Sequence, residues 1–261
     1  MALDRTLVQI RERSYPDILD LALVVIRHRP GTIGATAAAG IAPWAALNAW
    51  LLREAGEIRA LGHLWAIMLE APIATAPLTI VLGGLMFGSK QRPSRVIATM
   101  LGRLMPMILY QFLLRSILIG TVALAWLVPT RMAFANEVIL LERGRWWKVW
   151  SRSTDLTADR SGDLFGQWLA ELVFGSSFVM AFWLATGQIA GVFEGELTWA
   201  QPEVDLVFNG WMILGIWIVV AFLSVVRFLT YIDQRIRLEG WEVELRLRAV
   251  GRTMREELEA W

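Results

Sequence analysis

Long apolar stretches separated by short charged ones dominate the pattern of this chain. A stretch of about 20 apolar residues is long enough to cross the hydrocarbon core of a membrane as a helix. Such stretches lie at about 31–52, 63–87, 104–142, 164–193 and 206–228. Charges are spread along every element of a soluble domain, whereas here they gather between the apolar stretches. The pattern predicts an all-α integral membrane helical bundle.

The stretch 104–142 is too long for one crossing and barely long enough for two. Lys and Arg concentrate on the cytoplasmic side of membrane proteins, so their positions decide between the two topologies. Of the 25 Lys and Arg, 21 fall in the segments 1–30, 88–103, 143–163 and 227–261. The last two segments hold five and seven of them, so a single crossing would leave 12 outside. Two crossings place all 21 inside.

We therefore predict about six membrane segments, including a full helix to about Val128 and a short or broken leg over 129–141. That leg is shorter than the ~17 residues of a normal span, so we expect it to be tilted or shielded by protein. The chain is then a multi-pass protein of the cell inner (plasma) membrane with both termini cytoplasmic. In the first span, Gly34, Ala38 and Ala42 recur every four residues, which favours close helix packing on that face.

Three regions follow from this topology. Residues 1–30 form a cytoplasmic segment with an interfacial amphipathic helix that ends before Pro30, or alternatively extends the first span. Residues 31–230 form the six-segment transmembrane domain. Residues 231–261 form a cytoplasmic amphipathic helix, because apolar residues recur there at helical spacing. This helix would contact a protein partner or the membrane surface, or dock on its own bundle.

Composition excludes several classes of chemistry. The chain is 56% hydrophobic with a mean hydropathy of +0.49, and it has no cysteine for disulfide or thiolate chemistry. The acidic residues near its start argue against a cleavable signal peptide. No metal-binding, P-loop, dinucleotide or nucleophile motif appears. We therefore predict no catalytic residue, cofactor, metal or nucleic-acid partner.

The polar residues inside the apolar stretches are the candidates for function. Arg115 lies near the middle of 104–142, where a charge costs at least ~2.5–3.5 kcal/mol, and Gln111 lies one turn before it. Glu171 lies at comparable depth with Gln167 one turn before it. We expect Arg115 to contact Glu171, with Glu70 as the alternative partner. Such a pair would be either a structural contact or part of a substrate or proton path.

Two further groups of residues bear on function. Asn136 and Glu137 on the short leg would either join helices or line a cavity. The segment after it would either bind anionic lipid headgroups on the cytoplasmic side or simply anchor the chain at the interface. That segment contains the basic and aromatic residues Arg143, Arg145, Trp146, Trp147, Lys148, Trp150 and Arg152.

The end of the last span reads TYIDQRIRLEG and resembles the YxDxRxRxEG ending of the glycerophosphoryl diester phosphodiesterase membrane-domain family of bacterial membrane proteins. The matching residues are Tyr231, Asp233, Arg235, Arg237, Glu239 and Gly240. Glu142 and Arg152-Ser153 are similar to that family's segment between a short membrane leg and the next span, and the SYPDILDLAL start agrees. The resemblance implies a helical membrane domain without the phosphodiesterase catalytic domain. We expect the motif to form a charge network at the cytoplasmic face.

These observations lead to two main hypotheses for function. The first is a non-enzymatic scaffold or accessory subunit of a membrane complex. The alternative is a small transporter or lipid-handling protein that uses an intramembrane Arg115/Glu171 site. A membrane enzyme acting on phospholipid headgroups has the least support, because no nucleophile–base set is visible.

Overall fold

The computed structural model describes residues 14–51, 59–86, 92–121, 123–142, 146–194 and 210–239, and these ranges are helical without any strand. Within these ranges, three stretches are long and apolar enough to cross a membrane: Gly62–Met86, Val149–Ile189 and Gly210–Leu238. A fourth follows if Pro93–Gly102 and Leu104–Gly120, which meet at 61°, form one bent span. The all-α prediction is confirmed, and six crossings remain a prediction.

The helices have the following bounds in chain order. They are α1 (Tyr15–His28), α2 (Pro30–Leu51), α3 (Arg59–Ala74), α4 (Ala76–Met86), α5 (Pro93–Gly102), α6 (Leu104–Met107), the π-helix η3 (Ile108–Leu114), α7 (Arg115–Gly120), α8 (Leu127–Arg131), α9 (Ala135–Leu141), the 3₁₀-helix η4 (Trp146–Lys148), α10 (Val149–Thr157), the 3₁₀-helix η5 (Ala158–Arg160), α11 (Ser161–Glu194) and α13 (Gly210–Glu239).

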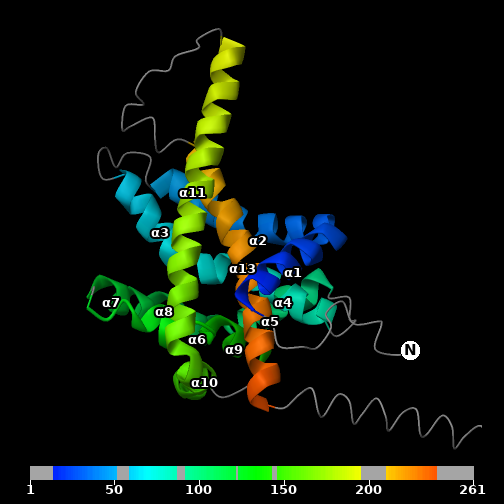
Figure 1. Ribbon diagram of the computed structural model, residues 1–261, viewed down its shortest axis with the longest axis vertical. Coiled ribbons are helices and arrows are strands. Elements are labelled where there is room, and N and C mark those ends of the chain that lie inside the picture. The colour runs from blue at the N-terminus through cyan, green and yellow to red at the C-terminus, as the bar shows by residue number, and fades with distance from the viewer. Residues whose placement is uncertain are drawn as a thin grey trace, which may run out of the picture.

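The two longest helices, α11 and α13, pack side by side along the long axis of the molecule (Figure 1). Glycines allow this close approach from both sides. A Cβ on Gly175 of α11 would lie 3.1 Å from Val219, and one on Gly215 of α13 would lie 3.0 Å from Phe182. Both distances are tighter than ordinary van der Waals contact, so each glycine lets the facing helix approach.

The packing face of α2 differs from the predicted one. Gly34, Ala38 and Ala42 are exposed, and a Cβ on Gly34 would meet nothing within 4 Å. The buried residues are instead Ile33, Ala37 and Gly40, and a Cβ on Gly40 would collide with the Ala74 carbonyl. The predicted small-residue face of α2 is therefore wrong, and the buried face contains Ala37 and Gly40 instead. Ile33 explains the choice, because its larger side chain gains more from burial.

The stretch 104–142 differs from the predicted pair of legs. The first helix ends at Gly120 rather than at about Val128, and the Thr121 hydroxyl donates to the Leu118 carbonyl at 3.0 Å. The second leg is two short helices, α8 and α9, separated at 132–134. Six of the seven residues of α9 are buried, so this part is shielded by protein as expected.

Two stretches predicted as loops are partly helical. α5 occupies much of the basic segment 88–103, beginning with Pro93 at a position where proline favours a helix start. α10 and η5 occupy most of 149–160. These short helices lack the long apolar run by which the sequence analysis identified the spans. Their many charges therefore led to the prediction of loops.

The chain ends only partly agree with the predicted terminal helices. α1 ends at His28, and Arg29 separates it from α2, so α1 is a helix distinct from the first apolar helix. α13 continues through residue 230 to Glu239, so no break precedes the C-terminal motif. The predicted amphipathic stripe at 243–261 lies outside the described residues.

Candidate functional site

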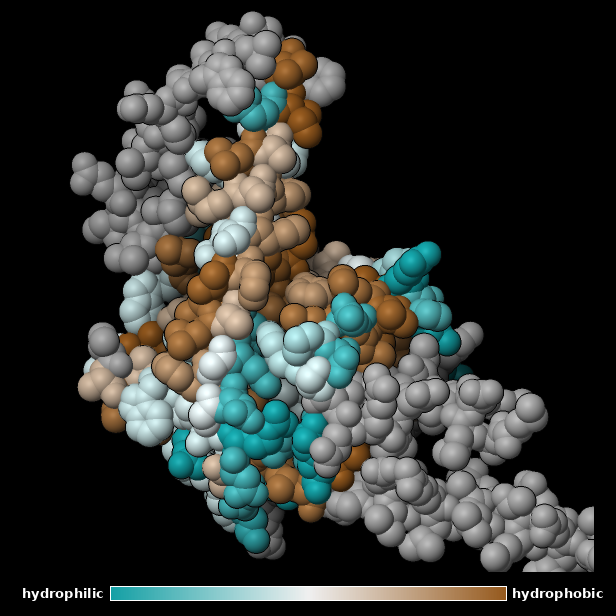
Figure 2. Space-filling view, in the orientation of Figure 1, coloured by the Kyte–Doolittle hydropathy of each residue, from teal (hydrophilic) through white to brown (hydrophobic). Residues whose placement is uncertain are grey.

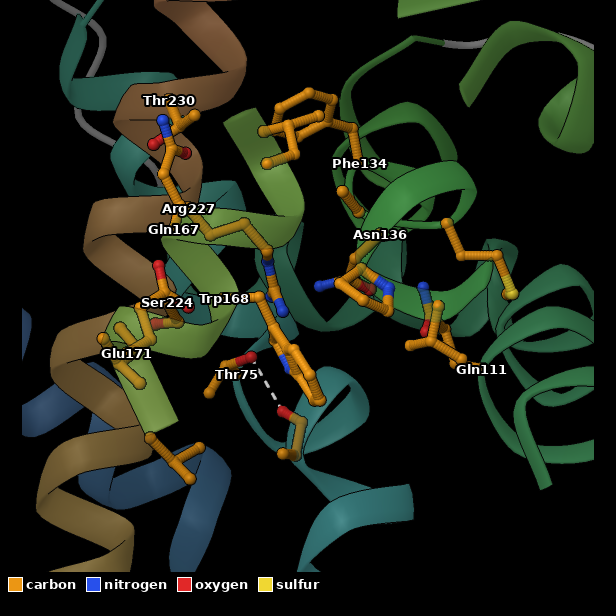
Figure 3. Close-up of a pocket in the computed structure, with 18 of the residues that line it drawn as sticks. Thr75, Gln111, Phe134, Asn136, Gln167, Trp168, Glu171, Ser224, Arg227 and Thr230 are labelled. Carbon is orange, nitrogen blue, oxygen red and sulfur yellow. Dashed lines mark hydrogen bonds between the residues drawn. The ribbon is translucent and has the colours of Figure 1, made fainter. Parts of the chain in front are cut away.

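A cavity of about 220 Å³ lies where α11 and α13 meet η3, α7, α8, α9 and the end of α3 (Figure 3). Its apolar walls include Val128, Leu164 and Leu223. Six of its other lining side chains have amide or charged groups. These are Gln111, Arg115, Asn136, Gln167, Glu171 and Arg227.

The cavity gathers most of the polar residues that the sequence singled out. Gln111 lies in η3, Asn136 in α9, and Gln167 with Glu171 on one face of α11. Figure 3 shows Glu171 on one side of the cavity, with Asn136 and Gln111 on the other. Glu70 is buried but does not line the cavity, whereas its neighbour Ala71 does.

Arg115 does not form the predicted contact. Its Nε atom is buried without a hydrogen-bond partner, and within the described ranges no ion pair joins it to Glu171 or Glu70. Glu171 instead accepts a hydrogen bond from the Tyr15 hydroxyl at 3.0 Å, and Glu70 accepts one from Asn48 Nδ2 at 2.6 Å. Each acid thus accepts one hydrogen bond from a neutral donor, and neither forms an ion pair with Arg115.

Asn136 is the second unpaired group in the cavity. It is 1% exposed, and neither its amide nitrogen nor its amide oxygen has a hydrogen-bond partner. Buried polar side chains nearly always have a partner in the protein or in bound solvent or ligand. An amide that lines a cavity with both atoms unpaired therefore indicates a position for a polar ligand group.

Next to the cavity lies an ion pair that the sequence analysis missed, of which Arg227 lines the cavity. Arg227 Nε of α13 lies 2.9 Å from Oε1 of Glu137, a residue that is 0% exposed. Arg227 Nη2 and Glu137 Oε2 have no hydrogen-bond partner, so the pair uses only part of its capacity. Figure 3 shows the Arg227 side chain extending from α13 into the cavity. The position of Arg227 inside the apolar run before Tyr231 could have indicated a buried charge. The sequence analysis counted Arg227 with the cytoplasmic charges instead.

Four charges therefore lie in or next to the cavity: Arg115, Arg227 and Glu171 line it, and Glu137 adjoins it through its ion pair with Arg227. Their sum is zero at neutral pH when all four are ionised. The unpaired donors belong to Arg115, Arg227 and Asn136, whereas Glu171 lies across the cavity on α11. The charges are thus separated in space although they cancel in total.

Tyr15 links the N-terminal helix to this site. Its hydroxyl donates to Glu171, and α1 also packs along α13. Burial, together with the nearby Glu171 carboxylate, raises the pKa of the Tyr15 hydroxyl. Tyr15 therefore remains a neutral donor at physiological pH and holds one oxygen of Glu171 in place.

A second polar cluster is centred on Glu142. Arg152 binds both of its carboxylate oxygens, Nε at 2.7 Å and Nη2 at 3.3 Å, and the Tyr231 hydroxyl donates to Oε1 at 2.9 Å. Arg235 lies 3.9 Å from the same oxygen and donates to the Tyr231 hydroxyl at 3.3 Å. The cluster connects the end of α9 to α10 and α13.

A neighbouring cluster is centred on Asp233, which is 2% exposed. Its carboxylate accepts from Arg237 at 2.8 Å and lies 3.8 Å from Arg160. Arg160 also contacts Asp163 and Gln234. Hydrophilic residues gather at this end of the molecule, near α10 and the C-terminal end of α13 (Figure 2). Tyr231, Asp233 and Arg235 of the motif thus contact residues of other helices, and Arg237 pairs with Asp233 within α13.

The basic and aromatic segment after α9 is only partly described. Arg143, Arg145 and Gly240 lie outside the described residues, and the side chains of Trp146 and Glu239 are not described. Trp147 and Lys148 are exposed, whereas Trp150 packs on the core. Arg152, expected to bind headgroups, pairs with Glu142 instead.

No group of three His, Asp or Glu side chains in the described part of the chain could hold a metal ion. Comparisons with protein-family models, curated proteins and solved structures find no match to this chain. The identification of the site therefore depends on its own geometry.

Proposed function

We propose that this chain is an integral membrane protein that binds a ligand with an anionic group in the cavity between α11 and α13. Of the two functions that the sequence suggested, this is the transporter or lipid-handling protein. The observation that carries the proposal is the half-buried Arg115 side chain, which lines the same cavity as the unpaired amide of Asn136. Its Nε atom is buried without a hydrogen-bond partner, and it has no ionic partner among the described residues.

The contrast between Arg115 and Arg227 supports a binding role for Arg115. A buried cation that serves only structure needs a partner, because an unpaired charge is strongly destabilising. Arg227 meets this requirement through Glu137 at 2.9 Å. Arg115 does not, although Glu171 lines the same cavity. An anionic ligand would supply the missing charge.

The proposal includes the predicted topology of six membrane segments with both termini in the cytoplasm. Arg152, Arg160, Arg235 and Arg237 all belong to the polar clusters at one end of the bundle, which supports the cytoplasmic assignment of that end. Under this topology the short helices α8 and α9 form a broken segment within the bundle. Such segments line binding sites in many transporters.

The proposal also places the chain near the glycerophosphoryl diester phosphodiesterase membrane-domain family. The two segments that carry the resemblance contact each other, since Glu142 binds both Arg152 and Tyr231. This contact explains why both segments would be needed together in such a fold. It supports the resemblance without assigning an activity.

Binding can be tested by thermal unfolding of the purified protein in detergent, with inorganic phosphate and glycerol 3-phosphate as probe anions. A ligand at ten times its Kd stabilises the folded state by about 1.4 kcal/mol. We expect this stabilisation in the unaltered protein and in Arg95→Gln, because Arg95 is exposed on α5. Arg115→Gln should lose it. Equal stabilisation of both variants, or none of the unaltered protein by any anion, would contradict the proposal.

A further inference from the structure

We infer that the ligand is a membrane lipid whose headgroup carries both a phosphodiester and a hydrogen-bond donor, and that it enters the cavity sideways past Trp168. This inference rests on the proposed function and specifies its substrate class. Four features of the cavity carry it: its opening, its volume, the positions of its charges and the acceptor on α11.

The opening lies on the apolar side of the bundle. Trp168 lines the cavity and is also 36% exposed, so the cavity wall continues to the outer surface at this residue. The following residues of α11, Leu169, Leu172 and Val173, are exposed as well. Figure 2 shows apolar residues covering much of α11. A ligand that enters beside Trp168 therefore comes from the lipid phase rather than from water.

The volume limits how much of the ligand fits. Pockets that enclose a drug-sized molecule are about 300–1,000 Å³, whereas this cavity is about 220 Å³. It can hold a headgroup but not acyl chains. The chains of a lipid would remain outside along the exposed apolar face of α11, which begins beside Trp168.

The donors match a phosphodiester. Guanidinium groups bind phosphate oxygens through charge-assisted hydrogen bonds, and an amide nitrogen adds a neutral donor. Arg115 Nε, Arg227 Nη2 and Asn136 Nδ2 are three such donors without partners in the protein. A phosphodiester carries one negative charge, which suits one unpaired guanidinium next to one that is already paired.

Glu171 adds a requirement for a donor on the headgroup. Its Oε1 accepts from Tyr15, which leaves Oε2 to accept from a ligand. A headgroup without a donor would bring its phosphate near this carboxylate with no compensating contact. An ammonium group, as in phosphatidylethanolamine, or a hydroxyl, as in phosphatidylglycerol, would supply that contact. The trimethylammonium group of phosphatidylcholine has no N–H to donate.

The inference can be tested by native mass spectrometry of the delipidated protein titrated with three lipids of identical acyl chains. We expect phosphatidylethanolamine and phosphatidylglycerol to bind about tenfold or more tightly than phosphatidylcholine. Arg115→Gln should remove this preference, and Arg95→Gln should keep it. Arg115→Lys keeps the positive charge but lacks the planar pair of guanidinium donors. If this variant folds and still loses the lipid preference, the loss comes from binding and not from unfolding.

Glu171→Gln tests the donor requirement. Gln keeps a neutral acceptor but removes the charge, so the affinity for phosphatidylethanolamine should fall more than that for phosphatidylglycerol. The entry route can be tested with a photo-crosslinking residue at position 168, which should capture a lipid. The same residue at exposed Phe174 of α11 gives the background. Capture at position 168 that Arg115→Gln does not lower relative to this background would overturn lateral entry at Trp168.

The outcomes distinguish this inference from the proposed function. If glycerol 3-phosphate binds in an Arg115-dependent manner while none of the lipids does, the anion site is real and the lipid inference is wrong. If phosphatidylcholine binds as tightly as the other two lipids, the donor requirement is wrong. If no probe depends on Arg115, both the inference and the proposed function are wrong.

Discussion

Glu137 of α9 and Arg227 of α13 form an ion pair inside the bundle, with Oε1 and Nε 2.9 Å apart and the Glu137 side chain fully buried. Removing one member of a buried pair leaves an uncompensated charge and costs about 3–5 kcal/mol. We expect Glu137→Ala to lower the free energy of unfolding in detergent by that amount. The double variant Glu137→Ala with Arg227→Met should be more stable than Glu137→Ala alone. A single variant as stable as the unaltered protein would show that the pair is not structural.

The contact between α2 and the end of α3 gives a second prediction. A side chain at Gly40 would collide with the Ala74 carbonyl, whereas one at Gly34 of the same helix meets nothing within 4 Å. Overpacking typically costs about 1–3 kcal/mol, and a backbone obstacle can shift little. We expect Gly40→Leu to lower the unfolding temperature markedly and Gly34→Leu to leave it nearly unchanged. A larger fall in unfolding temperature for Gly34→Leu than for Gly40→Leu would instead support the packing face that the sequence suggested.

The Glu142 cluster should contribute measurably to stability. Glu142→Gln removes the charge that binds Arg152 and Tyr231, and hydrogen bonds to charged groups contribute about 1.5–3 kcal/mol. Arg152 is about one-third exposed, so solvent weakens its share, and we expect a loss near the lower value. Asp155→Asn, on the exposed face of α10, is the matched control. Chemical unfolding followed by circular dichroism measures both, and equal stabilities would argue against a structural cluster.

The predicted topology can be tested directly because the chain has no cysteine. Ser151 is exposed on α10, so Ser151→Cys should react with a membrane-impermeant maleimide only from the cytoplasmic side. Glu196 belongs to the acidic link between the last two apolar stretches of the sequence, so Glu196→Cys should react only from the outside. Labelling of Ser151→Cys only from the outside and of Glu196→Cys only from the cytoplasm would instead indicate a single crossing over 104–142 and exclude the proposed topology.

The sequence predicted the helical class, and it identified the polar residues within the apolar stretches because these are visible without a structure. Arg115, Gln111, Asn136, Gln167 and Glu171 all line one cavity. The sequence could not predict which of these residues contact one another and which contact residues elsewhere in the chain. The Tyr15 hydroxyl lies 156 positions from Glu171 in sequence, and no local pattern indicates such a contact.

The errors have physical causes as well. Arg227 lies at the edge of an apolar run, so charge counting placed it with the cytoplasmic residues although it reaches the buried Glu137. The end of the helix at Gly120 depends on a local cap, which apolar composition does not reveal. The buried face of α2 depends on what the facing helix presents, here the Ala74 carbonyl.

The π-helix η3 has a consequence for how the site depends on chain length. A π-helix accommodates one more residue per turn than an α-helix and is often found at functional sites. Each residue of an ordinary helix turns the following side chains by about 100°. Deleting one residue within Ile108–Leu114 would let that segment relax to a regular helix of six residues, which turns the chain through nearly the same total angle and keeps Arg115 directed toward the cavity. The direction of the Arg115 side chain should therefore tolerate the loss of one residue from η3, whereas the same loss from an ordinary α-helix would turn the following side chains by about 100°.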